Sequence, residues 1–131
     1  MSSGKQIVID ASALLAVLFC EPSAKLVTRE MNEHLGGLLM STVNAAEVMM
    51  IIRSRRAGNV ELLEQTLMAS GIQFIPPTLD HARRAAEACD RFPLNLGDCF
   101  AYALSVTENC PILTLDEDFH RCDRPILFPP S

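Results

Sequence analysis

The sequence predicts an α/β fold in which helices cover both faces of a central parallel sheet of four to five strands. Short apolar runs alternate with longer segments of helical periodicity, which is the pattern of strands buried within a parallel sheet. With 131 residues, of which 49% are hydrophobic and 21% charged, the chain fits one globular domain, residues 1–131. No internal repeat or linker interrupts the alternation.

The first strand is expected in the run QIVID, residues 6–10, which is rich in β-branched residues. A helical run, LLAVLF, follows it. Pro22 is expected to start a second helix, which continues to about Leu35 and is ended by two glycines. The run LLMS, residues 38–41, then predicts a second short strand.

A pair of helices is expected in the middle of the chain. Asn44 is a plausible N-cap for the first helix, which runs to about Ala57 and is terminated by Gly58. Asn59 restarts a helix that Gly71 closes. The two segments therefore predict a helical pair.

The second half of the chain repeats the alternation of strands and helices. The expected elements are a strand at 72–75, a helix at 78–92, a helix opened by Asp98 that runs to 109, a strand at 111–115, a turn at 116–123 with one helical turn, and an edge strand at 125–128. Strands in this order predict a parallel sheet, and functional groups gather beyond the carboxyl ends of the strands in such sheets.

The charge and the sorting signals restrict the class of protein. The net charge of -5 opposes general attraction to nucleic acid, so a polyanion would need a local basic patch. One such patch is the cluster Arg53, Arg55 and Arg56, although a solvated helix face is the simpler explanation of such a cluster. No apolar segment is long enough to span a bilayer and the first residues do not form a signal peptide, so we expect a cytoplasmic protein without membrane association.

The five cysteines form no CxxC pair and are expected to be reduced thiols of the core. His120 and Cys122 lie close in sequence but are too few for a zinc site.

Acidic residues are placed where the predicted sheet would bring them together. Asp10 follows the first strand and Asp116 follows the fourth, with Asp118 two residues later. Glu47 and Asp98 lie in the first turns of helices that would cross nearby. Helix capping could explain Asp10, with Ser12 as a competitor, or Asp98, and solvation could explain the acidic turn. Neither explains why all of them fall at one edge of the sheet.

A divalent cation would relieve the repulsion and the desolvation of carboxylates gathered in this way. Oxygen ligands without cysteine or histidine favour Mg²⁺ or Mn²⁺ over Zn²⁺. Such an ion can activate water for attack on phosphorus. Because the chain shows no nucleophile arrangement of serine, cysteine and histidine, hydrolysis of phosphodiesters is the best reaction class.

The chain resembles the PIN-domain nucleases and, among them, the VapC-type toxins of toxin–antitoxin pairs. The resemblance rests on the stretches VIDASALLAVLF, STVNAAE, LNLGDCFAYALS and LTLDEDF, in this order and across nearly the whole chain. It implies a three-layer α/β/α sandwich and an endoribonuclease that depends on Mg²⁺, with Mn²⁺ able to substitute. It also implies an RNA substrate of the tRNA or rRNA class, inhibition by a cognate antitoxin, and a homodimer.

The resemblance assigns roles to individual residues. Asp10, Glu47 and Asp98 take the places of the three core acids, Asp116 takes the fourth and less strictly kept place, and Asp118, Ser12, Ser41 and Asn44 are supporting candidates. The helical pair would form a clip that contacts the antitoxin and the dimer mate through Met49, Met50, Ile51 and Ile52, although these could equally be core residues. Arg53, Arg55 and Arg56 are candidates for contact with RNA or antitoxin.

Other readings of the acids are weaker. A phosphoacceptor receiver domain would need an aspartate after a central strand and a late lysine, and a haloacid-dehalogenase-type phosphatase would need an aspartate where Ser12 stands. A PIN-like module that binds RNA or protein without cleavage remains open, and metal-dependent cleavage discriminates it from the nuclease.

Overall fold

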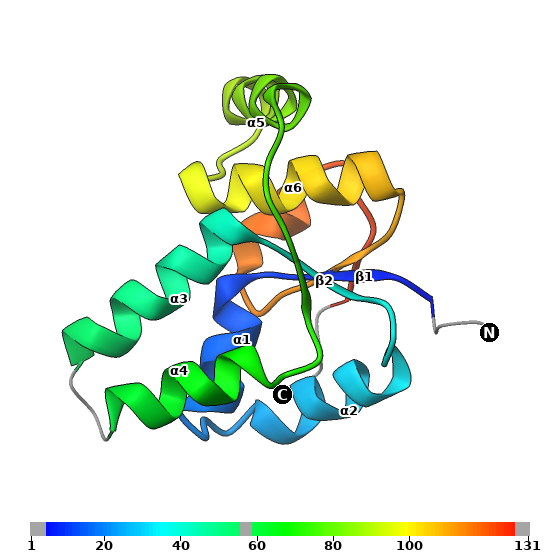
Figure 1. Cartoon of the computed structure of the whole chain (residues 1–131). Coiled ribbons are helices and arrows are strands. Elements are labelled where there is room, and N and C mark those ends of the chain that lie inside the picture. Colours follow the sequence, from blue (N-terminus) through cyan, green and yellow to red (C-terminus); the bar gives the residue numbers. More distant parts are fainter. Residues whose placement is uncertain (1–4, 56–58, 128–131) are drawn as a thin grey trace.

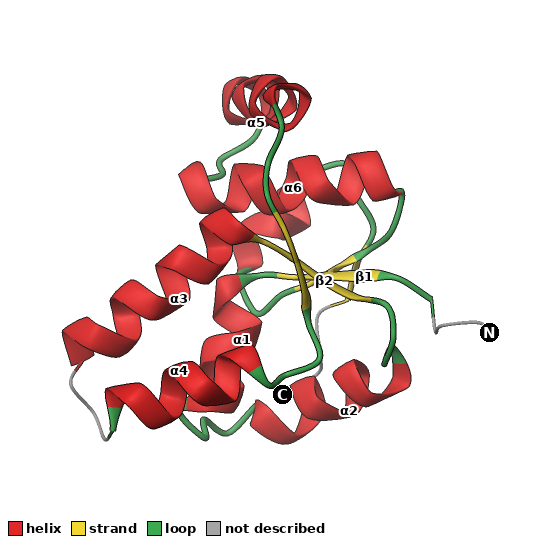
Figure 2. Ribbon diagram, viewed as in Figure 1, coloured by secondary structure: helices red, strands yellow, loops and turns green. Residues whose placement is uncertain are grey.

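A five-stranded parallel sheet lies between two layers of helices in the computed structural model of the protein, which describes residues 5–55 and 59–127 (Figures 1 and 2). The strands are β1 (Ile7–Ile9), β2 (Leu38–Ser41), β3 (Gln73–Ile75), β4 (Ile112–Leu113) and β5 (Ile126–Leu127). The helices are α1 (Ala11–Leu18), α2 (Ala24–Glu33), α3 (Thr42–Arg55), α4 (Val60–Met68), α5 (Leu79–Arg91), α6 (Leu96–Glu108) and the 3₁₀ helix η1 (Glu117–Arg121).

The strand order is β3-β2-β1-β4-β5, and every neighbouring pair is parallel. The strand β1 is therefore central, and it pairs with β2 on one side and with β4 on the other. Because the strands are parallel, the segments that leave β1, β2 and β4 start from the same edge of the sheet. These segments carry most of the predicted site.

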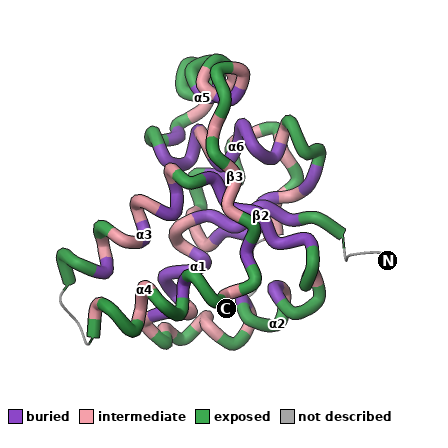
Figure 3. The backbone as a smooth tube through the Cα atoms, in the orientation of Figure 1, coloured by how far each residue is buried: buried purple, intermediate pink, exposed green. Residues whose placement is uncertain are grey.

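Alternate residues of the strands point to opposite faces of the sheet, and each face builds its own core. Ile7 and Ile9 pack with the apolar faces of α1, α2, α3 and α4. Val8 and Leu39 point the other way, toward α5, α6 and Phe119 of η1. Buried positions accordingly concentrate along the strands and on the helix faces that meet them (Figure 3).

The fold class and the number of strands agree with the prediction, and β5 is an edge strand as expected. The expected helical pair is also present, as α3 and α4, which form the lower left of Figure 1. Among the described residues, no helix is both long enough and apolar enough to cross a membrane.

Two predicted helix starts were wrong. Asn44 is not an N-cap, because α3 already begins at Thr42 and Asn44 is buried in its first turn. Asp98 does not open its helix either, since α6 begins at Leu96 and is capped by the side chain of Asn95. The Asn44 side chain contacts the site rather than the helix end, whereas the Asp98 carboxylate takes part in the cap of α6 and also borders the site, as described below.

The prediction that the cysteines belong to the core was wrong for two of them. Cys99 and Cys110 are buried and Cys122 is half-buried, but Cys20 and Cys89 are exposed. Cys20 lies in the turn after α1, and Cys89 lies near the end of α5.

Candidate metal centre

Asp10 lies at the carboxyl end of the central strand and is buried, with 2% of its surface exposed. It is the N-cap of α1, where its Oδ1 accepts a hydrogen bond of 3.0 Å from the backbone N–H of Ala13. The Ser12 hydroxyl donates to the same carboxylate at 2.8 Å, and the Thr114 hydroxyl donates to Oδ2 at 2.6 Å. Asp10 therefore caps the helix itself, while the competing Ser12 holds the Asp10 carboxylate in place.

Thr114 connects Asp10 to the turn after β4. Its hydroxyl oxygen accepts a hydrogen bond of 2.9 Å from the backbone N–H of Asp116 while the hydroxyl donates to Asp10. On the same side, Ser12 Oγ accepts a hydrogen bond of 3.0 Å from the N–H of Leu115. These bonds fix the turn that carries Asp116 against the end of the central strand.

Asp98 reaches the site from the first turn of α6. Asn95 and Asp98 form a capping box, in which Asn95 Oδ1 accepts from the N–H of Asp98 at 2.9 Å and the Asp98 carboxylate accepts from the N–H of Asn95. This reciprocal cap stabilises the start of the helix and fixes the direction of the carboxylate. Asp98 is buried, with 8% of its surface exposed.

Glu47 comes from α3 and lies against the first turn of α6. One Asn44 amide group donates to Glu47 Oε1 at 2.9 Å and to the carbonyl oxygen of Gly97 at 3.0 Å, so it ties the two helices together. A β-carbon on residue 97 would coincide with the Glu47 carboxylate, so this approach requires glycine. Asn44 Oδ1 is buried and has no hydrogen-bond partner in the structure.

Asp116 and Asp118 lie on η1, where Asp116 is the N-cap and its Oδ1 accepts from the N–H of Asp118 at 2.9 Å. Carboxylate oxygens of Asp98, Asp116 and Asp118 all lie within 4.8 Å of one another. Asp118 is exposed, Asp116 is half-buried and Asp98 is buried, so the cluster opens from the interior to the solvent.

The electrostatics of the buried acids show that these carboxylates act on one another. Burial raises the pKa of Asp98 to about 7, and the negative charges of Asp116, Asp10 and Glu47 add to the rise. Burial raises the pKa of Asp10 to about 6, although the hydrogen bonds from Thr114, Ala13 and Ser12 oppose the change. A proton or a cation is therefore strongly favoured at this site near neutral pH.

The residues of the site fit a hard divalent cation. All of the donors are carboxylate oxygens, and no lysine or arginine of residues 5–55 and 59–127 forms an ion pair with them. Histidine and cysteine are absent from the cluster that the described residues form, so the chemistry favours Mg²⁺ or Mn²⁺ over Zn²⁺. Asp98, Asp116 and Asp118 offer the tightest group of donors, with Asp10 and Glu47 adjoining them.

The remaining predicted residues lie at varying distances from this cluster. Ser41 is buried at the end of β2, where its hydroxyl oxygen accepts a hydrogen bond of 3.2 Å from the N–H of Val43, so its observed contact is with the start of α3. Arg53 forms a two-point ion pair with Glu64 of α4, at 3.0 Å. Arg55 lies over the ring of Phe19 and 3.7 Å from Glu21. Arg56 lies outside the described residues.

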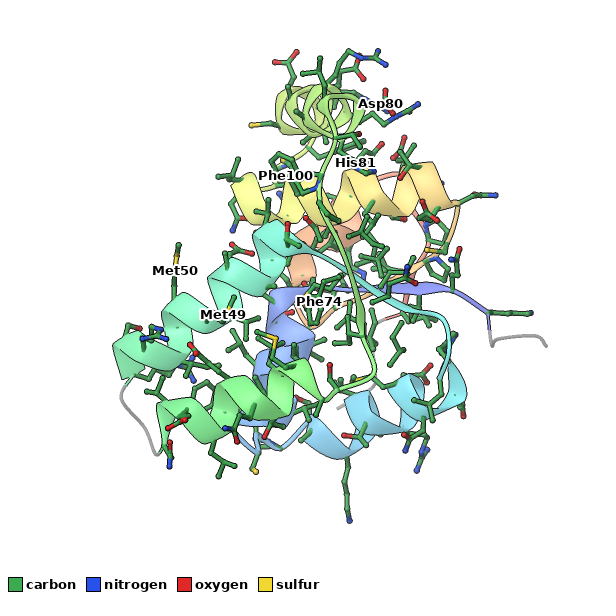
Figure 4. All side chains as sticks on the ribbon, in the orientation of Figure 1. Met49, Met50, Phe74, Asp80, His81 and Phe100 are labelled. Atoms are coloured by element: carbon green, nitrogen blue, oxygen red, sulfur yellow. The ribbon has the colours of Figure 1, made fainter. Side chains whose placement is uncertain are left out.

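The apolar candidates of α3 divide between core and surface. Ile52 is fully buried and Ile51 is half-buried, so they belong to the core as the alternative reading had it. Met49 is half-buried and faces Phe74 and α4. Met50 is 67% exposed and projects from the outer side of α3 (Figure 4).

Two residues of the site were missed from the sequence, Thr114 and Gly97. Thr114 had a signal, since a hydroxyl residue inside the apolar run PILTL must find a partner when it is buried. Gly97 also had one, because a glycine inside a helix weakens it unless close packing requires the residue.

Comparison with known proteins identifies the family of the chain. Residues 7–125 match the PIN domain family. A Ribonuclease VapC of Mycolicibacterium smegmatis is 34% identical over 125 residues, which cover 88% of this chain and 95% of that protein.

Two solved structures share the fold. A toxin–antitoxin complex from Klebsiella pneumoniae contains a chain with a TM-score of 0.75 and 17% identity, covering 96% of this chain and 99% of that one. Mycobacterium tuberculosis VapC20, described as a sarcin-ricin loop cleaving toxin, gives a TM-score of 0.74 at 17% identity, over 92% of this chain and 100% of that one. At 17% identity these two structures show the common fold alone. The VapC relative, at 34% identity, shows the family of the chain. The chain therefore belongs to the PIN-domain family, as one of its VapC ribonucleases.

Proposed function

We propose that this protein is an endoribonuclease that hydrolyses RNA phosphodiester bonds with Mg²⁺ or Mn²⁺ and acts as the toxin of a toxin–antitoxin pair. The observation that carries the proposal is the convergence of Asp10, Glu47, Asp98 and Asp116 at one edge of the sheet, with Asp118 beside them. The kinship with a VapC ribonuclease supports the reaction class. We treat residues 1–131 as one PIN domain in this proposal.

Some residues of the site would bind the ion, and others would position the side chains around it. Asp98, Asp116 and Asp118 would bind the cation, together with Asp10 from the central strand. A divalent ion held by these residues would supply the Lewis acidity to activate water and the positive charge to offset the charge that develops on phosphorus. Asn44 fixes the Glu47 carboxylate next to this group by donating a hydrogen bond to it.

The partners follow from the same proposal. A cognate antitoxin is supported by the structural neighbour that was solved as a toxin–antitoxin complex. We propose RNA of the tRNA or rRNA class as substrate, supported by a neighbour described as cleaving the sarcin-ricin loop. We also propose a cytoplasmic location. The α3–α4 pair with the exposed Met50 would contact the antitoxin or a second copy in a homodimer.

Cleavage of a labelled structured RNA in the presence and absence of Mn²⁺ tests the activity. We expect cleavage with Mn²⁺ alone and none after chelation, and we expect Asp98→Asn or Glu47→Gln to reduce the rate by 100-fold or more, by order of magnitude. Glu117→Gln is a matched control, because Glu117 is exposed between Asp116 and Asp118 but is not part of the acidic cluster. Full activity in the Asp98 and Glu47 variants would reject the site.

The alternative is a module that binds RNA or protein without cleavage. It predicts Mn²⁺-independent binding and no product from any RNA, whereas the nuclease predicts product that carries new termini.

Growth of cells that express the chain without an antitoxin provides a second test of the nuclease. We expect growth arrest that Glu47→Gln relieves, and an equally toxic Glu47→Gln variant would show that the harm is not nucleolytic.

A further inference from the structure

Two cysteines of the α5–α6 hairpin take no part in the proposed nuclease site. Cys89 lies near the end of α5 and is exposed, whereas Cys99 lies near the start of α6 and is buried. Both side chains line one cavity of about 320 Å³ between the two helices. The pair therefore combines a thiol that solvent reaches with a second thiol inside the fold.

The two thiols are direct neighbours. The Cys89 side chain lies close enough to Cys99 to act on its thiol electrostatically. The Cys99 thiol also faces the carbonyl oxygen of Leu94, at 3.6 Å. The wall of the cavity near them is formed in part by small side chains, those of Ala85 and Ala86, which leave space for the sulfur atoms to adjust.

We propose that Cys89 and Cys99 form a dithiol site that peroxides or small disulfide compounds convert reversibly into an intrachain disulfide. With hydrogen peroxide, the exposed Cys89 sulfur attacks one peroxide oxygen, which breaks the O–O bond and gives a sulfenic acid and water. The Cys99 sulfur then attacks the Cys89 sulfur, which forms the S–S bond and releases the second water. Two thiols lose two electrons in total, and the peroxide gains them.

The position of the pair gives the disulfide a structural effect. The loop that it closes, residues 90–98, includes Asn95 and Asp98, the two members of the capping box. A bond between Cys89 and Cys99 therefore anchors the first turn of α6 to α5. An excess of a dithiol reductant would reopen the bond by thiol–disulfide exchange.

Peptide mapping of the whole chain tests the pair directly. The reduced protein is treated with hydrogen peroxide or with a small disulfide compound, alkylated and digested with trypsin. Cys89 is then the only cysteine of peptide 85–91, while Cys99 shares peptide 92–121 with Cys110. We expect the chain to lose two of its five free thiols. The two peptides should become linked with a mass about 2 Da below their sum, and dithiothreitol should reverse the link.

Matched variants identify the partners. Cys89→Ser and Cys99→Ala should each abolish the link, whereas Cys20→Ser, which removes another exposed cysteine, and Cys110→Ala should retain it. Because Cys99→Ala changes a buried residue, Cys89→Ser provides the same test at an exposed position. The absence of a link in the wild-type chain, a link that survives Cys99→Ala, or covalent dimers on a non-reducing gel in place of the internal bond would each overturn the proposal.

Discussion

The carboxylate of Glu47 lies against Gly97, in the space that a β-carbon on residue 97 would fill. The contact joins α3 to α6, and the Asn44 amide reinforces it by donating to both partners. A residue with no role in chemistry therefore decides where one of the candidate ligands is placed. Several expectations about the site follow from contacts of this kind.

Gly97→Ala should displace Glu47 and lower Mn²⁺-dependent RNA cleavage by about 10-fold or more, because supporting residues of metal sites have effects of this size. The helix itself should tolerate alanine, which favours helical structure. Gly71→Ala is the opposite control. Gly71 has open space around it but a φ of +82°, so its replacement should destabilise the fold by about 1 kcal/mol with the site geometry unchanged. Rates and thermal unfolding of both variants separate the two effects, and equal losses of activity would contradict the assignment.

Thr114→Val should weaken binding of Mn²⁺ by about 10-fold, since it removes the hydroxyl that links Asp10 to the backbone of Asp116. Thr114→Ser keeps the hydroxyl and should bind the ion nearly as well as the wild type. Titration calorimetry with Mn²⁺ measures both variants. If valine and serine give the same affinity, the hydroxyl does not support the site.

Asp98→Asn should stabilise the metal-free protein at pH 8. The pKa of Asp98 is about 7 in the folded protein against an ordinary value of 3.8, so ionisation opposes folding at pH values above 3.8. The free energy of unfolding that is lost through ionisation of Asp98 is largest above pH 7, on the order of 4 kcal/mol. This loss disappears as the pH falls below 3.8. Unfolding midpoints at pH 8 and pH 4 should therefore show a gain for the variant only at the higher pH.

Saturating Mn²⁺ should raise the unfolding temperature of the wild type at pH 8 and leave Asp98→Asn nearly unchanged, because the ion binds the folded form and needs the carboxylate. Thermal scans with and without the ion provide the measurement. A wild-type protein insensitive to Mn²⁺ at millimolar concentration would contradict a metal centre.

Arg53→Gln should weaken binding to RNA or to the antitoxin if the basic cluster of α3 contacts either of them. The variant also breaks the ion pair with Glu64, so Glu64→Gln is the matched control, and an exposed pair of this kind contributes only about 0.5 kcal/mol to stability. Binding at several salt concentrations should show a smaller salt dependence for Arg53→Gln alone. Equal binding and equal salt dependence in Arg53→Gln and Glu64→Gln would show that Arg53 only joins α3 to α4 and does not contact RNA or the antitoxin.

Local patterns predicted the layers of the fold correctly because the inner strands β1, β2 and β4 are fully buried and the helices are bounded by glycine, proline or a polar cap. The meeting of Asp10 with Asp98 and Asp116 was also predictable, since the ends of parallel strands share one edge of the sheet. What local patterns missed depends on distant contacts. Asn44 has the sequence of a cap, but its amide binds Gly97, 53 residues away, and Thr114 binds Asp10 across 104 residues.

The exposure of the cysteines was mispredicted for a related reason. The buried positions of the alanine-rich helix α5 are His81, Ala85 and Ala88, whereas Cys89, which directly follows Ala88, is exposed although it lines the cavity between α5 and α6. His81 instead takes a buried position, where it contacts Thr107 of α6 and completes the cap of α5, between the two helices in Figure 4. Composition alone gives no rule for which small residue faces the partner helix.

Asp10 lies near the start of the chain and Asp116 follows the fourth strand, yet the two are joined through Thr114. During synthesis the central strand leaves the ribosome early, but it lacks β4 on one side until residue 113 has emerged. The acidic site therefore cannot assemble on a partly made chain. For a protein proposed to cut RNA, this order of assembly delays activity until translation has passed the last acid.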